Sequence, residues 1–279
     1  MKQSIIYWGL WLAGAFVAGL IVLGFASDAI LNSKDHPPLI PITASTGPEA
    51  VARGQHLATI YGCMGCHGET LQGQEWFDQP LEGALDAANL TRAMPHYTDA
   101  ELARAIRAGV RPDGSALWDM PSEGWIETTD AEVADLIAWL RMHPPAGEPS
   151  QRLRVTFLGR IAVLMGRIKP TARHVAEARA NPAFDAGPAF ARGRHLAATV
   201  CSECHGSNLK GRPGDTPDLL MAAAYDDVHF RRLMKTGIGM GGQELGLMTV
   251  VARSRFSHLS DQDVTDLHAY LTARAEGMP

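Results

Sequence analysis

The stretches CMGCH (residues 63–67) and CSECH (residues 201–205) decide the fold of this chain. Together they contain all four cysteines, so none is left for a disulfide. A redox-active dithiol or half of a zinc site would also use two cysteines at this spacing. A histidine directly after the second cysteine, however, is specific to covalent haem attachment. The two copies of the motif therefore predict two covalently bound haem c groups.

Each motif supplies three groups to its haem. In sites of this kind the two cysteines bond the porphyrin vinyl groups, and the adjacent histidine coordinates the iron from one face. The cysteines expected to bond haem are Cys63, Cys66, Cys201 and Cys204. The expected first axial ligands are His67 and His205.

The sequence around the two motifs is also repeated. Residues 52–57 read ARGQHL and residues 191–196 read ARGRHL, and each stretch leads within a few residues to its own motif. Further along, Trp139 of the first copy corresponds to Tyr270 of the second. Self-similarity of this kind indicates two copies of one structural module.

Each copy is predicted to form three helices, of which the first ends at the haem motif. The second and third helices are expected at residues 98–108 and 130–142 in the first copy, and at residues 227–236 and 261–274 in the second. Long loops between these helices would enclose the haem, because a structureless loop inside a small domain usually encloses something. No strand-rich pattern stands out.

Local signals support these helix boundaries. A hydroxyl side chain followed three residues later by a carboxylate can satisfy free amide groups in the first turn of a helix. The pairs of this kind are Thr98 and Glu101, Thr129 and Glu132, and Ser260 and Asp263. Gly109 and Gly237 suit helix ends. Gly54 and Gly193 lie at equivalent first-helix positions, where a glycine under an aromatic ring would let two helices cross closely.

The sixth iron ligands are predicted by comparing the two copies. Gly109 to Met120 and Gly237 to Met248 are each eleven residues apart, in loops that run from the second helix toward the third. Met120 and Met248 are therefore the expected ligands, although methionines more often fill cores than bind metal. The alternatives are Met94 and Met240.

The remaining histidines are not predicted to bind iron. His56 and His195 match across the repeat and lie on the first helix of each copy, where we expect a packing or hydrogen-bonding role. The others have no matched partner, and we expect them to be ordinary surface or loop residues. They are His36, His96, His143, His174, His229, His258 and His268.

The first 27 residues are predicted to form a retained membrane anchor. No residue from Ile5 to Ala26 is charged, and 22 residues at about 1.5 Å each make a helix of roughly 33 Å, enough for a bilayer core. A cleaved signal peptide is the alternative, but its apolar region is usually about 7–15 residues long. The positive charges before the span, at Lys2 and the amino terminus, leave that end in the cytoplasm. We expect a single-pass anchor in the inner (cytoplasmic) membrane with the haem domains in the periplasm.

Both modules resemble class I cytochrome c domains, and the exported chain resembles the membrane-anchored dihaem cytochrome c family. In the first half the matching stretches are residues 89–91 (NLT), 109–114 (GVRPDG) and Met120-Pro121. In the second half they are residues 246–251 (GLMTVV) and 257–261 (SHLSD), which are similar to cytochrome subunits of periplasmic alcohol and gluconate dehydrogenases. Those subunits usually carry three haem motifs, whereas this chain has two.

The resemblance implies an all-α fold of two class I cytochrome c domains in tandem, preceded by one N-terminal transmembrane helix. The expected segments are a transmembrane anchor at 1–27, a linker at 28–48, cytochrome c domain 1 at 49–145, a basic connector at 146–188 and cytochrome c domain 2 at 189–279. The two cytochrome domains are called the first and second modules below.

Charge is distributed unevenly over these segments. The first module has 6 basic and 15 acidic residues, the connector 7 and 3, and the second module 10 and 10. The basic residues around the apolar run of the connector are Arg152, Arg154, Arg160, Arg167 and Lys169. They could lie on an anionic membrane surface. A linker helix that packs on the acidic first module is the favoured interpretation.

The leading functional hypothesis is an electron carrier. The composition, 46% hydrophobic and 20% charged, is that of a globular protein. Methionine ligation closes the iron to substrates and raises the reduction potential. A haem enzyme, such as a dihaem peroxidase or a thiosulfate-oxidising cytochrome, is the alternative, but it would need an open or unusual sixth position. A haem-based sensor would need a signalling domain that is not evident here.

The expected partners follow from this hypothesis. Besides the membrane, they are redox proteins: a terminal oxidase, a soluble cytochrome or a periplasmic dehydrogenase. The chain could also be one subunit of a respiratory complex. The acidic first module would attract a basic partner at a rate that falls with salt. No nucleic-acid partner is expected.

Overall fold

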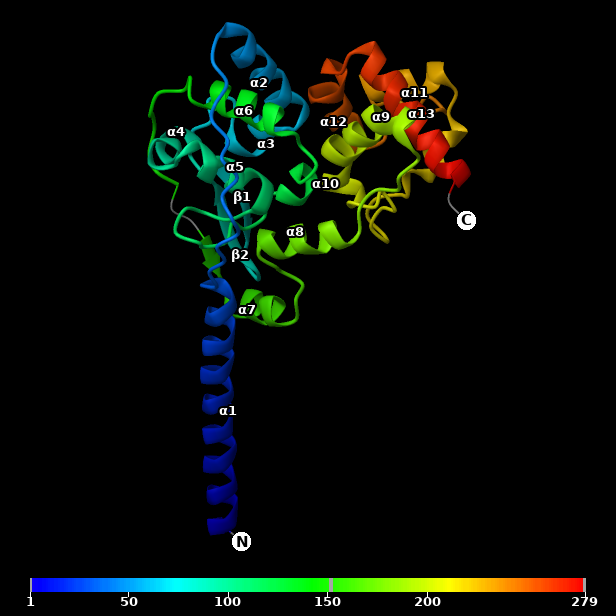
Figure 1. Cartoon of the computed structure of the whole chain (residues 1–279). Coiled ribbons are helices and arrows are strands. Elements are labelled where there is room, and N and C mark those ends of the chain that lie inside the picture. The colour runs from blue at the N-terminus through cyan, green and yellow to red at the C-terminus, as the bar shows by residue number, and fades with distance from the viewer. Residues whose placement is uncertain (1, 151–152, 278–279) are drawn as a thin grey trace.

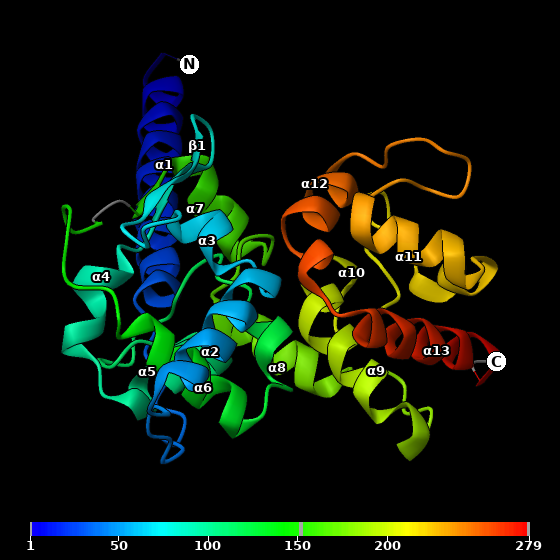
Figure 2. The same ribbon diagram turned by 90° about the horizontal axis from the view of Figure 1, so that it is seen from above.

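The computed structural model describes residues 2–150 and 153–277, with only the backbone for residues 2–5. One long helix, α1 (Lys2–Leu31), stands below two helical modules that lie side by side (Figures 1 and 2). The predominance of helix and the single apolar helix at the N-terminus confirm the predicted fold class.

Helix α1 is exposed along most of its length. Its segment Ile6–Leu31 has a mean hydropathy of 2.1 and is long and apolar enough to cross a membrane. A retained anchor and a signal sequence share this property. The helix therefore agrees with the predicted anchor without excluding the alternative.

The linker after α1 runs along the first module to the start of α2 at the far end (Figure 1). The backbone amide of Asp35 donates to the carbonyl of Gly114 at 2.9 Å, and that of Ser45 donates to the carbonyl of Ala134 at 3.1 Å. Ile42, between these two points, is buried in the core. The linker is thus fixed to the module surface.

The first module contains the three predicted helices and several short elements. In chain order they are α2 (Pro48–Ile60), α3 (Cys63–His67), β1 (Gln74–Gln79), β2 (Gly83–Ala87), α4 (Leu90–Ala93), η1 (Met94–His96), α5 (Asp99–Ala108), η2 (Ser122–Trp125) and α6 (Asp130–Leu140). Helices α5 and α6 begin with the capping boxes predicted at Thr98 and Thr129. Gly109 ends α5 with φ 66°, a left-handed conformation that glycine adopts without strain.

Helices α2 and α6 cross at a glycine, as predicted. A Cβ atom on Gly54 would lie 2.0 Å from the carbonyl oxygen of Asp135 and 2.8 Å from Cβ of Trp139. No side chain fits in that space. The absence of a side chain therefore sets the distance between these helices.

The second module repeats this arrangement. Its elements are η3 (Pro188–Phe190), α9 (Ala191–Leu196), the π-helical turn η4 (Ala197–Cys201), α10 (Ser202–His205), η5 (Leu219–Ala224), α11 (Asp227–Thr236), α12 (Leu247–Ser254), η6 (Phe256–His258) and α13 (Asp261–Gly277). Gly193 lies against α13, where a Cβ would meet the carbonyl oxygen of Asp266 at 2.0 Å and Cβ of Tyr270 at 2.6 Å. Contrary to prediction, Met248 lies not in a loop but in the first turn of α12, a helix that was not predicted.

A small antiparallel sheet in the first module was also not predicted. Strand β2 pairs with β1 on one side and with β3 (Leu153–Val155), from the connector, on the other. Strand β1 is mostly exposed, so its sequence lacks the alternation of apolar and polar residues that marks a half-buried strand. Backbone pairing rather than side-chain burial holds this strand.

The connector forms two helices that lie in different places. Helix α8 (Thr171–Ala180) packs against η2 and α5 of the first module and lies at the junction of the two modules (Figures 1 and 2). Helix α7 (Phe157–Leu164) instead packs against the end of α1. Arg152, one of the basic residues named above, lies outside the described residues. The predicted packing of a connector helix on the first module is thus observed for α8, whereas α7 packs against α1 and also touches the β1–β2 turn of the first module.

A side-chain hydrogen bond joins the two modules. Nε2 of His195, on α9, lies 2.8 Å from Oε1 of Glu132, the carboxylate of the α6 capping box. His56, the matched residue of the first module, is exposed. Partial burial of its ring lowers its pKa, and the negative charge of Asp263 in the second module opposes this shift. The hydrogen-bonding role predicted for His195 is therefore observed, and it is a contact between modules.

One histidine differs from its prediction as a surface or loop residue. His268 lies on α13 and is only 8% exposed. Its Nδ1 atom is 2.8 Å from Oδ1 of Asp227, and its ring stacks on Phe230 with 4.3 Å between ring centroids. Because Phe230 and Asp227 come from α11, far away in the sequence, the pattern around His268 gave no indication of this packing.

Candidate functional site

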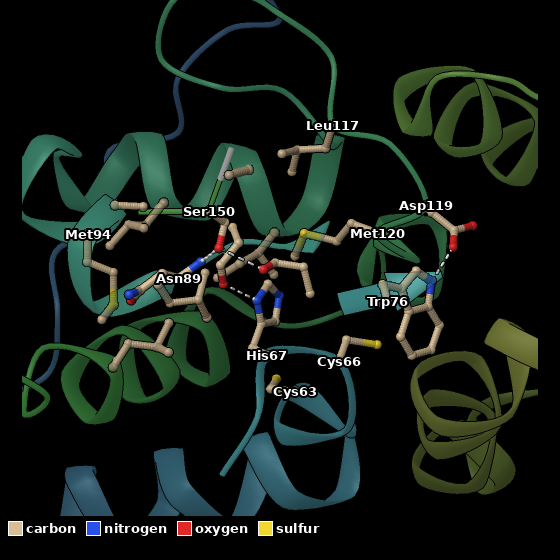
Figure 3. Close-up of a pocket in the computed structure, with 18 of the residues that line it drawn as sticks. Cys63, Cys66, His67, Trp76, Asn89, Met94, Leu117, Asp119, Met120 and Ser150 are labelled. Atoms are coloured by element: carbon tan, nitrogen blue, oxygen red, sulfur yellow. Dashed lines mark hydrogen bonds between the residues drawn. The ribbon is translucent and has the colours of Figure 1, made fainter. Parts of the chain in front are cut away.

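A cavity of about 680 Å³ lies directly above the first motif. Cys63, Cys66 and His67 line one side, and Met120 and Leu117 are among the residues around the rest (Figure 3). Most of its wall is apolar, and its volume is within the range of cofactor pockets, about 300–1,000 Å³. The structure therefore brings the predicted first-module residues together around a space whose size and apolar wall suit a large apolar group.

The histidine of each motif is held in the orientation that a metal ligand needs. Nδ1–H of His67 donates to the carbonyl of Ala88 at 2.8 Å, and Nδ1–H of His205 donates to the carbonyl of Pro217 at 2.8 Å. A carbonyl can only accept, so Nδ1 must carry the proton and Nε2 keeps its lone pair. Burial lowers the pKa of both histidines, which favours the neutral, metal-binding form.

Equivalent loops position these histidines. Leu71 and Leu209 follow the two motifs at the same distance and have φ values of 58° and 61°, a left-handed conformation that is uncommon for leucine. The carbonyl of Leu71 accepts the amide of Leu90 at 2.8 Å, and that of Leu209 accepts the amide of Leu219 at 3.0 Å. Each loop thus turns back to the segment whose carbonyl holds the histidine.

The cysteines fit covalent attachment better than the alternatives. None of them is in a disulfide. Burial raises the pKa of Cys63 to about 12 and that of Cys201 to about 12, whereas a redox-active dithiol needs an accessible thiolate. Among the residues that the structure describes, no group of three or more Cys, His, Asp or Glu residues could hold a metal ion. A zinc site at either motif is therefore not supported.

Met120 and Met94 both line the first cavity, but they differ in their surroundings. Met94 is 2% exposed and belongs to the hydrophobic core. Met120 extends into the cavity above His67 in Figure 3, whereas Met94 lies further to one side. The hydroxyl of Thr171 donates to the carbonyl of Met120 at 3.0 Å and so fixes the backbone from which Met120 extends. The geometry favours Met120 over Met94.

In the second module, Met248 is partly buried and packs against the core, whereas the Met240 side chain is 43% exposed. The hydroxyl of Thr249 donates to the carbonyl of Gly237 at 2.8 Å and accepts the amide of Leu245 at 2.7 Å. These bonds fix the first turn of α12 beside the end of α11. The burial pattern favours Met248 over Met240.

The second module contributes part of the wall of the first cavity. The guanidinium of Arg255 lies over Gly62, the residue before the first motif, and Nη1 of Arg255 is 2.7 Å from Oε2 of Glu203. Glu203 lies inside the second motif, and both side chains line the cavity beside Cys63 and Cys66. This ion pair, called the seam pair below, therefore joins the two motifs.

The seam pair and several wall residues were not predicted from the sequence. Arg255 and Glu203 are 52 residues apart and have no counterparts in the repeat that would mark them. Trp76 of β1 donates its indole N–H to the carboxylate of Asp119, and both line the cavity. Arg111, also in the wall, lies within the GVRPDG stretch, which was the one available signal.

The comparisons with known proteins agree with this geometry. The family model for cytochrome c matches residues 51–143 and again residues 190–274, so each match contains one motif. The chain belongs to the cytochrome c family. Domains of this family carry covalently bound haem c and transfer electrons.

The relatives of this cytochrome are subunits of dehydrogenases. It is 26% identical over 271 residues to the fructose dehydrogenase cytochrome subunit of Gluconobacter japonicus, with 84% of this chain and 54% of the relative covered. It is 24% identical over 270 residues to the gluconate 2-dehydrogenase cytochrome c subunit of Pantoea cypripedii, covering 79% and 58%. It is 26% identical over 172 residues to the cytochrome c subunit of alcohol dehydrogenase (quinone) of Komagataeibacter europaeus, covering 56% and 35%. The chain thus spans little more than half the length of the first two relatives.

These similarities are to electron-carrying subunits rather than to the catalytic subunits of dehydrogenases. They agree with the electron-carrier hypothesis and do not favour a haem enzyme.

Proposed function

We propose that this cytochrome is a membrane-anchored carrier with two haems per chain, which relays electrons from a dehydrogenase or another respiratory donor to a terminal acceptor. The seam pair is the observation that supports this proposal most directly. It brings the second motif to the wall of the first cavity, so the two sites share a contact instead of lying at opposite ends of the chain.

The proposed ligands of the first haem are Cys63, Cys66, His67 and Met120. Those of the second haem are Cys201, Cys204, His205 and Met248. Haem iron, when bound, supplies a one-electron couple whose potential depends on its axial ligands and surroundings. The chain itself orients His67 and His205 through backbone carbonyls and lines the first cavity with apolar side chains that exclude water.

The proposed division of the chain follows the expected segments. The modules comprise residues 49–145 and 189–279, residues 1–27 act as the anchor, and the segments at 28–48 and 146–188 act as linker and connector. With α1 retained in the inner membrane, both modules would lie in the periplasm. The matches at residues 51–143 and 190–274 support the limits of the modules.

The proposed donor is a dehydrogenase, by analogy with relatives that are subunits of fructose, gluconate and alcohol dehydrogenases. Because the first module has 15 acidic and only 6 basic residues, a partner that binds this module is expected to present a basic surface. The acceptor would be a terminal oxidase or a soluble cytochrome.

Intact mass spectrometry and optical spectra of the purified holoprotein test this proposal. We expect a mass increase of two haems, and little change on adding carbon monoxide to the reduced protein because both sixth positions are closed. A mass with fewer than two haems, in protein made with working haem-attachment machinery, would overturn the dihaem assignment. Strong carbon monoxide binding by the wild type would instead indicate an open site and favour a haem enzyme.

A further inference from the structure

Helix α7 exposes its apolar side chains. Phe157, Leu158, Leu164 and Met165 are 50%, 48%, 40% and 63% exposed. With the partly exposed Ile161, they follow the spacing i, i+1, i+4, i+7, i+8, which places them on one side of the helix. Such a face is the reverse of the pattern of a helix on the surface of a soluble protein.

The opposite side of α7 is fixed to the protein. Gly159 and Val163 are buried, and a Cβ on Gly159 would lie 2.0 Å from the carbonyl oxygen of Glu82 in the β1–β2 turn. The amide of Thr156, at the start of α7, also donates to Glu82 at 3.1 Å. The apolar face of α7 is therefore held in place on the first module and is called the α7 surface below.

The α7 surface lies beside the end of the proposed anchor. Helix α7 packs against α1, and Nη1 of Arg160 is 2.7 Å from the hydroxyl of Ser27 and 2.6 Å from Oδ1 of Asp28. Ser27 and Asp28 follow directly after the uncharged stretch that ends at Ala26. In Figure 1, α7 sits where α1 meets the first module. If α1 spans the bilayer, α7 is therefore at the depth of the lipid headgroups.

The basic side chains of the connector are not the main source of attraction between the α7 surface and a membrane. Arg154 pairs with Asp78 at 3.0 Å, Lys169 pairs with Glu177 at 2.7 Å, and Arg160 is engaged with α1. Of the basic residues in the described part of the apolar run, most are thus already paired within the protein. Apolar burial is left as the main favourable contribution, about 25 cal/mol for each Å² removed from water.

We propose that α7 is a second membrane contact, which lies in the interfacial layer of the same bilayer that α1 crosses and inserts the α7 surface among lipid headgroups and upper acyl chains. The inference rests on the proposed retention of α1 as an anchor. An amphipathic helix typically sits about 5–10 Å into this layer. The contact holds the first module against the membrane and fixes its orientation.

Thiol labelling of the full-length holoprotein in lipid nanodiscs tests this proposal. Leu158→Cys and Met165→Cys report on the α7 surface, and Val228→Cys, on the 76% exposed Val228 of α11, is the matched control. Each is treated with a charged, lipid-excluded maleimide and with an apolar maleimide. Reduced ionisation of a thiol in an apolar layer slows both reagents alike and cancels in their ratio, whereas only the charged reagent is excluded from that layer. We therefore expect the ratio of charged to apolar labelling at 158 and 165 to be at least roughly tenfold below that at 228.

Equal ratios at all three positions in nanodiscs would overturn the lipid contact. Low ratios that persist in protein without lipid, and disappear on dilution, would instead reveal a second copy of the chain on the α7 surface and also overturn the proposal. Failure of the proposed function would give a different result. The native cysteines are expected to be bonded to haem and so unreactive, and labelling of the wild-type protein would show that they are free. Extraction by alkaline carbonate, measured on the cell membranes before purification, reports separately whether α1 is retained in the bilayer.

Discussion

The two modules have the same motif and the same crossing of first and third helices, but they enclose their sites differently. In the first module, Met120 extends from a loop that is held by Thr171 of the connector, and residues of the second module complete the cavity wall. In the second, Met248 comes from the first turn of the module's own helix α12. The hydrogen bond of His67 is partly buried, whereas that of His205 is at the surface.

This difference shows that the motif fixes the chemistry of attachment while the surrounding segments set the environment. Burial and local charge are among the factors that set a haem potential. We therefore expect two distinct potentials in one chain, with the more enclosed first haem the less sensitive to ionic strength. The predictions below change one module at a time.

The largest effect is expected from Met120→Leu and Met248→Leu. Leucine keeps the bulk of the side chain but lacks the sulfur, so one iron should lose its sixth ligand without unfolding of the module. We expect the weak long-wavelength absorption of the oxidised protein to fall by half and the potential of that haem to fall by on the order of 0.1–0.3 V, within the span of about 0.8 V that axial ligands control. New carbon monoxide binding should appear at one haem per chain.

Met94→Leu and Met240→Leu are the matched controls for these variants, and neither should change the spectrum. If Met120→Leu left the spectrum unchanged while Met94→Leu removed half of the long-wavelength absorption, the ligand would be Met94. The electron-carrier proposal would survive that result, but the assignment of Met120 would not.

A somewhat smaller effect is expected from Gly54→Ala and Gly193→Ala, which test whether the two modules fold alike. Each new methyl group would meet a backbone carbonyl at 2.0 Å, so the helices must move apart. Overpacking of this kind costs roughly 1–3 kcal/mol, and occasionally more. Urea unfolding followed by circular dichroism should show the loss in the altered module. Gln55→Ala, on the exposed side of α2, should be nearly neutral.

The seam pair is predicted to affect the first haem by a smaller amount. Arg255→Gln removes a positive charge from the wall of the first cavity, so the reduction potential of the first haem should fall by on the order of tens of millivolts. Glu203→Gln should raise it. Arg253→Gln is the control. Arg253 pairs with Glu244 at 2.7 Å, and both side chains are more than half exposed. Spectroelectrochemical titration measures all three, and equal shifts in Arg253→Gln and Arg255→Gln would exclude a specific role of the seam pair.

The smallest effect concerns the contact between modules. Although burial opposes it, hydrogen bonds from His195 and from the amide of Thr129 hold the pKa of Glu132 below its ordinary value of 4.5. A carboxyl with a lowered pKa in the folded state stabilises the protein above pH 4.5, and that contribution is lost as the pH falls through the lower folded value. We expect Glu132→Gln to cost about 0.5–1 kcal/mol at neutral pH and to flatten the acid limb of the stability curve.

Glu101→Gln is the control for this measurement. Glu101 occupies the same capping-box position in α5 and its pKa is also lowered, but by its contacts with Thr98 rather than by a histidine of the other module. Thermal unfolding between pH 3 and pH 7 compares the two variants. An acid limb equally flat in both would mean that His195 adds nothing beyond the cap.

Features that depend on local chemistry could be predicted from the sequence. Haem motifs, helix caps and the glycine crossings are each set by a few neighbouring residues or by a repeat. The second and third helices expected in each module lie close to their observed limits, whereas α12 was not predicted. The enclosure of the sites was not predictable in this way. The β1–β2 hairpin is held by backbone pairing, and Arg255 meets Glu203 across 52 residues, so neither leaves a periodic trace in the sequence.

The prediction for the histidines shows the same limit. His195 was expected to form a hydrogen bond and does so, but its partner is in the other module. His268 was expected at the surface and is buried by α11. In both cases the decisive neighbour comes from a distant segment, and its position depends on how whole helices pack.

The linker between α1 and α2 limits how this cytochrome can meet its partners. A flexible chain of 16 residues, as at 32–47, would let a tethered domain sweep through roughly 20–24 Å and visit donor and acceptor in turn. Here the linker is pinned to the first module at Asp35 and Ser45, with Ile42 buried between them. With α1 as the proposed anchor, the module therefore cannot swing on it. A membrane-bound partner must then reach the module by lateral diffusion and a soluble partner by diffusion from solution, each at a fixed face, and a protein that already occupies one of those faces would block exchange.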